Sequence, residues 1–226
     1  RSVYAISKVF AYHSVIHYRE AYNLHACNGI LFNHESPRRG VNFVTKKIIQ
    51  GLTRIKQGKQ KNLVLGNLYS RRDWGHAKDY VESMWKILQQ KKPDDFVVAT
   101  RTSHSVKDFI NICAKKLGIK LLWKNKGLKE VGIDKESNKI IIRINKKYFR
   151  ETEVDDLIGD FSKAKRLLQW KPKYSFNKLT VSCAPKISVI VVKFLISEKR
   201  TVAILLFPPN ISESWVNNLS AISGSI

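Results

Sequence analysis

The chain is poor in cysteine, and its few thiols are not arranged for disulfide or metal chemistry. Three cysteines lie far apart without a CxxC pair. This excludes a disulfide framework or a cysteine-rich metal site and suits a reducing compartment such as the cytoplasm. Long uninterrupted apolar runs are also missing, because charged residues break the stretches ISVIVVKFLI and TVAILLF. We therefore expect a cytoplasmic protein with no membrane-spanning helix and no bound metal.

Closely spaced glycines are missing as well. The two nearest glycines, Gly127 and Gly132, are five residues apart, so the sequence contains no GxGxxG loop of the kind that binds dinucleotide phosphates. The chain opens on Arg1 without a methionine. We expect that it was cut from something longer, and that any glycine-rich dinucleotide-binding half lies upstream.

Acidic residues are scarce, and the formal net charge is +23. Such a charge can indicate a nucleic-acid-binding protein. Here the basic residues are spread along the whole chain, and the densest clusters, such as KQGKQK, contain no aromatic side chain on which a base could stack. We therefore rank a basic nucleic-acid-binding module only third among the interpretations. An anionic small substrate such as a nucleotide also suits this charge.

Apolar periodicity predicts helices and strands in alternation. Helices are expected over residues 5–22, 43–57, 106–117 and 160–170, with a further one that RRDWGHAKDY leads into and that ends at about residue 90. Strands are expected over 26–32, 62–66, 95–100, 119–123 and 139–144. Ser105 and Asp108 form a candidate capping box for the fourth helix. Residues 33–40, NHESPRRG, read as a polar loop. The alternation predicts an α/β fold.

Tyr4 and Lys8 are a candidate catalytic pair. Positions four apart share one face of a helix, and a nearby ammonium favours a phenolate that can exchange a proton with a substrate hydroxyl. The spacing alone favours two ordinary helix residues, because Tyr174 and Lys178 repeat it. Neighbouring motifs have to decide between the two interpretations.

Those motifs resemble one enzyme family from about residue 3 to residue 179. YAISK, NHESPRRG, FVTKKI, RRDWGHAKDY, YFRETEVD and GDFSKAKRLLQWKPK are together similar to GDP-mannose 4,6-dehydratases, which are extended short-chain dehydrogenases/reductases. The resemblance implies an incomplete NAD(P)-binding Rossmann-like fold, with its N-terminal half missing, that retains the sugar-nucleotide-binding region. It further implies a lyase that uses NADP to convert GDP-mannose into GDP-4-keto-6-deoxymannose in GDP-fucose biosynthesis, working as a homo-oligomer.

The resemblance also assigns roles to individual residues. Tyr4 would be the catalytic tyrosine, and Lys8 its partner and a contact to the nicotinamide ribose. Further NADP contacts would fall on His34 and Arg39. Contacts to the sugar nucleotide would come from Asn33, Val44, Lys47, Arg72, Arg150 and Glu153. Without the resemblance, each of these would be interpreted as a structural or surface residue.

The sequence departs from the family in three main places. The family's Thr-x-Glu, which supplies the elimination base, precedes the tyrosine and has no counterpart here. The glycine-rich loop and the first strands of the cofactor domain are also missing. Within the matched region, Glu151 stands where the family usually has proline. After residue 179 the resemblance stops, and residues 180–226 contain only two of the 18 acidic residues. We expect residues 180–226 to be a divergent apolar tail, and favour read-through into non-coding sequence over a genuine appended segment. We expect this chain alone to be inactive; the alternative is a non-catalytic nucleotide-sugar-binding or oligomer-interface protein.

Overall fold

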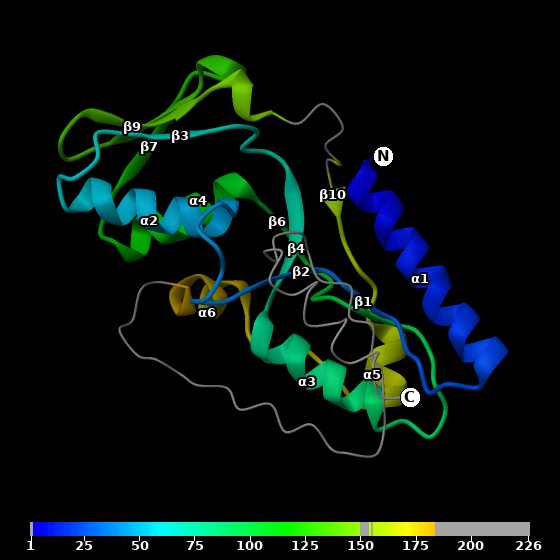
Figure 1. Cartoon of the computed structure of the whole chain (residues 1–226). Helices are drawn as coiled ribbons and strands as arrows, with labels where there is room; N and C mark the ends of the chain where they lie inside the picture. Colours follow the sequence, from blue (N-terminus) through cyan, green and yellow to red (C-terminus); the bar gives the residue numbers. More distant parts are fainter. Residues whose placement is uncertain (1, 150–153, 155, 184–226) are drawn as a thin grey trace.

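The computed structural model describes residues 2–149, 154 and 156–183, and its elements are labelled in Figure 1. Helices and strands alternate along most of the chain, as the sequence predicts. In chain order the elements are α1 (Val3–Tyr22), β1 (Gly29–Leu31), β2 (Asn33–Glu35), α2 (Val44–Lys56), β3 (Leu63–Leu65), β4 (Arg71–His76), α3 (Ala77–Leu88), β5 (Phe96–Val98), β6 (Ser103–Ser105), α4 (Val106–Lys116), β7 (Leu121–Lys124), the 3-10 turn η1 (Gly127–Lys129), β8 (Val131–Asp134), β9 (Lys139–Ile144), the 3-10 turn η2 (Lys146–Tyr148), β10 (Asp156–Leu157), α5 (Ser162–Leu168) and α6 (Phe176–Ser182).

The strands form three small sheets. Strand β1 pairs in parallel with β5, and β4 is the centre of a second sheet, with β2 and β10 parallel to it and β6 antiparallel. The third sheet has the order β3-β9-β8-β7. Helices α2 and α4 lie along one side of this third sheet, while α3 and α5 lie beside the first two (Figure 1). The α/β prediction is confirmed.

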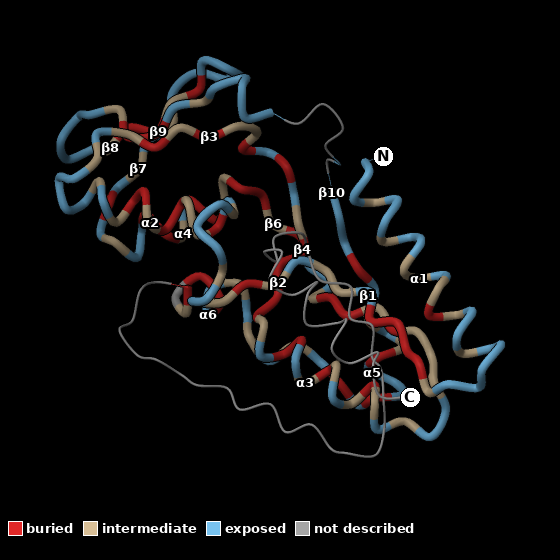
Figure 2. The backbone as a smooth tube through the Cα atoms, viewed as in Figure 1, coloured by how far each residue is buried: buried red, intermediate tan, exposed pale blue. Residues whose placement is uncertain are grey.

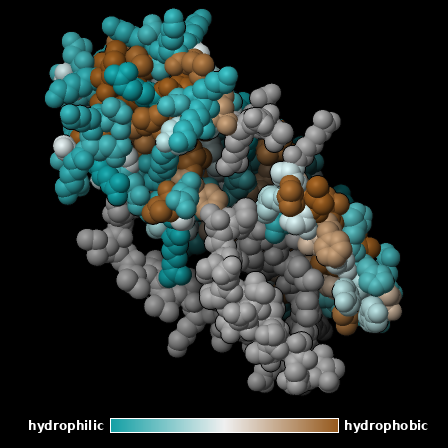
Figure 3. Space-filling view, turned by 45° about the horizontal axis from the view of Figure 1, so that its top comes forward, coloured by the Kyte–Doolittle hydropathy of each residue, from teal (hydrophilic) through white to brown (hydrophobic). Residues whose placement is uncertain are grey.

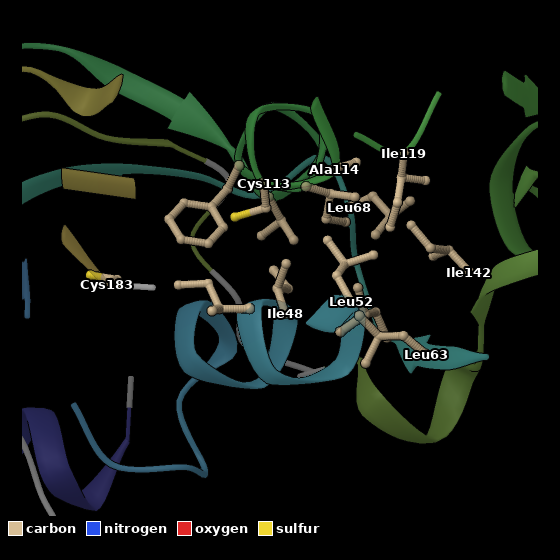
Figure 4. Packing of buried hydrophobic residues seen from close by; sticks show 14 of the residues in the cluster. Ile48, Leu52, Leu63, Leu68, Cys113, Ala114, Ile119, Ile142 and Cys183 are labelled. Atoms are coloured by element: carbon tan, nitrogen blue, oxygen red, sulfur yellow. The ribbon is translucent and has the colours of Figure 1, made fainter. Parts of the chain in front are cut away.

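The larger core fills the space between α2, α4 and the third sheet. Figure 4 shows Ile48 and Leu52 of α2 facing Cys113 and Ala114 of α4, with Ile142 of β9 beside them. Fully burying an aliphatic or aromatic side chain of this kind contributes about 1.5–3 kcal/mol. A second cluster, which includes Tyr80 and Trp170, joins α3 to α5 (Figure 2). These two cores hold the loops between them in place.

Helix α1 packs differently from the prediction. The sequence suggests an apolar face, but Ile6 is 68% exposed and Phe10 75% exposed, and within the described residues of this helix only Val15 is buried. Figure 3 shows hydrophobic side chains on the surface of this helix, at the right. Its anchoring contacts lie toward its C-terminal end, where Arg19 pairs with Asp95. The helix predicted over residues 5–22 is confirmed, and the N-terminal half of its apolar face is exposed in the described structure.

Short polar strands and one late helix are the elements that the sequence analysis missed. Strand β2 lies inside the predicted polar loop, and β4 occupies the segment expected to lead into a helix. Strands β6 and β8 were also not expected. Helix α6 extends beyond residue 179, and Cys183 packs in the larger core. Residues 184–226 of the predicted tail lie outside the described residues. None of the helices that the structure describes is long and apolar enough to cross a membrane.

Candidate functional site

Tyr4 and Lys8 lie on one face of α1, near its start. The helix begins after Ser2, whose hydroxyl accepts a hydrogen bond from the backbone N–H of Ala5 at 3.1 Å. The ammonium of Lys8 lies 5.3 Å from the centre of the Tyr4 ring, and the tyrosine is 40% exposed. The spacing of four residues therefore brings the two side chains together, with the phenol accessible from solvent.

Burial is the main influence on the pKa of the Tyr4 phenol. It raises this pKa, and the positive charge of Arg39 opposes the shift. The ammonium of Lys8, whose own pKa is lowered by burial, lies over the Tyr4 ring. The role of Lys8 as the catalytic partner of Tyr4 stays a prediction.

His34 is held in place as a neutral imidazole. It lies on β2, its Nδ1 is 2.9 Å from the carbonyl oxygen of Phe32, and its ring stacks on Tyr80 with 4.7 Å between the ring centres. Burial lowers the pKa of His34. Asn33, the preceding residue, is exposed at the start of the same strand. The two residues therefore present an imidazole and an amide at one edge of the second sheet.

Arg39 is held between a carboxylate and an aromatic ring. Its Nε lies 3.2 Å from Oε2 of Glu35, which is 3% exposed, and its guanidinium carbon lies 3.5 Å from the centre of the Phe43 ring. The same Glu35 oxygen accepts a hydrogen bond from Thr45 Oγ1 at 2.8 Å. Although Nε is close to Glu35, no acceptor in the described part of the chain is aligned for a hydrogen bond to it. The Arg39 guanidinium is therefore partly buried, and its Nε–H group has no hydrogen-bond partner among the described residues.

Val44 and Lys47 lie in the first turn of α2. The backbone N–H of Lys47 donates to the carbonyl oxygen of Phe43 at 2.8 Å, and its ammonium lies 4.2 Å from the centre of the Tyr148 ring. Tyr148 comes close because Gly66 has no side chain: a Cβ there would lie 2.3 Å from the Tyr148 carbonyl oxygen. Glycine at the end of β3 therefore lets η2 approach α2.

Arg72 lies in β4, where that strand pairs with β10. Its Nη1 donates hydrogen bonds to the carbonyl oxygens of Arg71 and Val154, each at 2.6 Å. These bonds fix the plane of the guanidinium at the start of the strand. Arg150 and Glu153, the other two expected substrate contacts, lie outside the described residues.

The structure thus brings together some of the expected residues. Lys8 lies over the Tyr4 ring, the charge of Arg39 acts on the Tyr4 phenol, and Arg39 is joined to the start of α2 through Phe43. The sequence analysis missed Glu35 and Thr45, which connect the loop to that helix. A signal for Glu35 was present, because a carboxylate four residues before Arg39 is a natural ion-pair partner; Thr45 had none. Among the described residues, no group of three or more histidine, cysteine or acidic side chains could hold a metal ion.

Three histidines should make this protein less stable as the pH falls below about 6.5, a higher pH than that at which most carboxylates titrate. Burial lowers the pKa of His34, His76 and His104 in the folded chain. Below the ordinary histidine pKa of about 6.5 the unfolded chain binds more protons at these sites, so the free energy of unfolding falls as the pH falls. Glu35, whose pKa is raised by burial, acts in the opposite direction at a lower pH.

We therefore expect the thermal unfolding midpoint to be lower at pH 5.5 than at pH 7.5. His34→Gln should make this difference smaller, because one of the three histidines no longer titrates. Equal midpoints for the parent chain at the two pH values would contradict the assignment of neutral, buried histidines.

Solved structures with a similar fold show which fold this chain has. The structure of RMD from Pseudomonas aeruginosa complexed with NADPH covers 81% of this chain, with a TM-score of 0.66 and 16% identity; the match spans 55% of that protein. A dTDP-glucose 4,6-dehydratase from Bacillus anthracis in complex with NAD also covers 81% of this chain, with a TM-score of 0.63, 18% identity and a match over 51% of its length. The fold is that of the NAD(P)-binding dehydratases and epimerases of the short-chain dehydrogenase/reductase type.

Sequence comparisons narrow this class to one family. The profile of the family GDP-mannose 4,6 dehydratase matches residues 1–182. The curated GDP-mannose 4,6 dehydratases of Drosophila melanogaster and Homo sapiens are 53% and 51% identical to this chain over 179 residues, and GDP-mannose 4,6 dehydratase 1 of Arabidopsis thaliana is 55% identical. These matches cover 79% of this chain and 45%, 48% and 45% of the three relatives.

The chain belongs to the GDP-mannose 4,6-dehydratase family, which confirms the resemblance seen in its motifs. It spans about half the length of the curated relatives it matches.

Proposed function

We propose that this chain carries the tyrosine–lysine pair and the sugar-nucleotide-binding region of a GDP-mannose 4,6-dehydratase. The reaction is the conversion of GDP-mannose into GDP-4-keto-6-deoxymannose, a lyase reaction on the route to GDP-fucose. The observation that carries the proposal is the position of the Lys8 ammonium over the Tyr4 ring, on the shared face of α1. Family membership supports it, because the curated relatives are named for this activity.

Tyr4 would exchange a proton with the C4 hydroxyl of the sugar. The phenol is neutral at rest because burial raises its pKa, so it needs a nearby cation when it gives up its proton. Arg39 supplies such a charge, and Lys8 lies over the ring, where its ammonium can also reach a ribose hydroxyl. The pair would therefore hold and move one proton at the phenol oxygen.

NADP is the cofactor that we propose for this site. When bound, it supplies the acceptor and donor of a hydride. The residues that would hold it are Lys8, His34 and Arg39. Their chemistry fits the group, because an ammonium and a partly buried guanidinium with an unaligned N–H suit ribose and phosphate oxygens. Of the similarly folded proteins, RMD is complexed with NADPH and the dTDP-glucose 4,6-dehydratase with NAD, so the fold supports a nicotinamide cofactor, and the choice of NADP rests on the resemblance of the motifs.

The sugar nucleotide would lie against residues of β2, the start of α2 and β4. Asn33, Val44, Lys47 and Arg72, with Arg150 and Glu153, are the proposed contacts to GDP-mannose. The two phosphate charges suit the lysine and the arginine fork.

We further propose that residues 1–179 form the family domain, that residues 180–226 are a separate segment, and that nucleic acid is not a partner. Three buried free cysteines support a cytoplasmic location.

A non-catalytic role is the second candidate. The exposed apolar residues of α1, such as Ile6 and Phe10, favour a protein that associates with other polypeptides, as a homo-oligomer of this family would. This alternative retains nucleotide-sugar binding and discards proton transfer. Formation of a 4-keto product that Tyr4→Phe abolishes would exclude it.

The proposed substrate class can be tested by calorimetric titration of the 226-residue chain. GDP-mannose should bind without added cofactor, and AMP, which has one phosphate and a different base, should bind at least roughly tenfold more weakly, a difference of about 1.4 kcal/mol. Equal affinity for the two ligands would mean that only the general positive charge is measured. Absence of GDP-mannose binding by the folded chain would overturn the proposed function.

A further inference from the structure

Glu35 is a buried carboxylate between the loop that carries Arg39 and the first turn of α2, which carries Val44 and Lys47. It is the last residue of β2, is 3% exposed and pairs in parallel register with His76 of β4. One of its oxygens, Oε2, is 3.2 Å from Arg39 Nε and 2.8 Å from Thr45 Oγ1. Burying a carboxylate is unfavourable unless it is paired, so these two contacts have a marked influence on the local structure.

The two partners belong to different segments. Arg39 lies in the loop after β2, where its backbone N–H donates to the carbonyl oxygen of Ser36 at 3.0 Å. Thr45 is buried in the first turn of α2, next to Val44 and two residues before Lys47. A single oxygen atom therefore links the loop that carries Arg39 to the turn that carries Val44 and Lys47.

Within the described residues, no side-chain hydrogen bond caps the start of α2. Phe43 is its N-cap residue and makes no side-chain capping hydrogen bond. Its ring instead packs against the Arg39 guanidinium, whose position depends on Glu35. Lys46 adds one outward bond, from its ammonium to the carbonyl oxygen of Pro37 at 2.9 Å. The orientation of this helix end thus depends on the Glu35 carboxylate.

We propose that Glu35 is a positioning residue that couples the placement of Arg39 to that of the first turn of α2. It touches neither ligand and acts through Arg39 on the cofactor side and through Thr45 on the sugar-nucleotide side. This inference rests on the proposed function for the roles of Arg39, Val44 and Lys47. The coupling itself depends only on contacts within the chain.

The first test compares Glu35→Gln with Glu82→Gln in the titration with GDP-mannose. Glutamine keeps an oxygen for Thr45 but removes the charge that holds Arg39. Glu82→Gln is the matched control. Glu82 lies on α3 and pairs with Lys86, and its substitution removes the same charge as Glu35→Gln. We expect Glu35→Gln to weaken GDP-mannose binding roughly tenfold, because the neutral amide no longer attracts the Arg39 guanidinium, and Glu82→Gln to change it less than about twofold.

A double-mutant cycle separates positioning from a general effect on stability. If Glu35 acts by orienting α2, its substitution should cost little binding once Lys47 has been replaced by alanine, because the oriented group is gone. We expect the tenfold loss to shrink to less than about threefold in the Lys47→Ala background. An equal loss in both backgrounds would mean that Glu35 only stabilises the fold, and would overturn the inference.

Amide hydrogen exchange tests the coupling without any ligand. The reporters are the N–H groups of Arg39 and Lys47, which donate to Ser36 and Phe43 in the two linked segments. Glu35→Gln should speed exchange at both, whereas Glu82→Gln should change neither. Unchanged exchange in Glu35→Gln would overturn the inference. If the folded parent chain does not bind GDP-mannose, the proposed function fails while exchange still decides the role of Glu35.

Discussion

Replacing Asp73 by alanine is expected to lower the free energy of unfolding by about 3–5 kcal/mol, because it removes several hydrogen bonds to a buried carboxylate, each typically worth about 1.5–3 kcal/mol before the losses overlap. Asp73 is fully buried in the middle of β4. Its Oδ1 accepts hydrogen bonds from the backbone N–H and the hydroxyl of Thr100, at 2.8 and 2.6 Å. Its Oδ2 accepts from the backbone N–H groups of Arg101 and Gly159, at 2.9 and 3.3 Å. Alanine would leave these donors without the carboxylate.

The strain at Arg101 increases the importance of this carboxylate. Arg101 has a φ of 65°, in the left-handed region that favours glycine. Its N–H bond to Asp73 helps to hold the turn in that conformation. Asp73 therefore fixes both the turn after β5 and, through Gly159, the segment that leads into α5.

Urea unfolding of Asp73→Ala measures this effect. Asp134→Ala is the matched control, because Asp134 bonds only to nearby residues of its own hairpin, including Ser137, and should cost less than about 1 kcal/mol. Asp73→Asn should also be destabilising, since the amide would turn a donor toward at least one of the N–H groups. If Asp73→Ala unfolds within about 1 kcal/mol of the parent chain, this account of the fold is wrong.

Replacing Arg72 by alanine is expected to weaken GDP-mannose binding roughly tenfold to a hundredfold. Losing a hydrogen bond from a charged group typically costs about 1.5–3 kcal/mol. In the proposed site Arg72 contacts the diphosphate, and its bonds to Arg71 and Val154 hold the guanidinium before a ligand binds. Little conformational entropy then has to be lost on binding, which favours a large effect of removing the side chain.

The measurement is calorimetry on Arg72→Ala beside Arg143→Ala. Arg143 is exposed on β9, so its removal lowers the net charge equally and controls for general electrostatic attraction. Arg72→Lys should give an intermediate loss, because it keeps the charge but not the planar fork. Unfolding midpoints of all variants show whether the fold is intact. Equal affinity of Arg72→Ala and the parent chain would show that this arginine does not contact the ligand.

Local sequence signals predicted the longer elements well because the interactions that define them lie close together in the chain. Periodic apolar residues marked α2 and α4, and the capping box formed by Ser105 and Asp108 is present with both of its hydrogen bonds. The continuous apolar run KIIIRI marked β9. In each case the side chains concerned are a few residues apart, so their spacing contains the information.

Short strands could not be predicted in this way. NHE in β2 and SHS in β6 are polar and only three residues long, so neither alternation nor β propensity identifies them. They become strands because β4 offers its backbone hydrogen-bonding groups on both sides. Pairing of this kind depends on distant residues, and no local pattern reports it.

The sequence by itself determined the family, the alternation of helices and strands, and the shared helix face of Tyr4 and Lys8. Only the tertiary structure decided that the charge of Arg39 acts on Tyr4, that Ile6 and Phe10 stay exposed, and that Glu35 links Arg39 to Thr45. The physical reason is that burial and charge–charge interactions depend on which segments meet in space. The exposure of a side chain and the distances between segments, which set these effects, are properties of the folded chain.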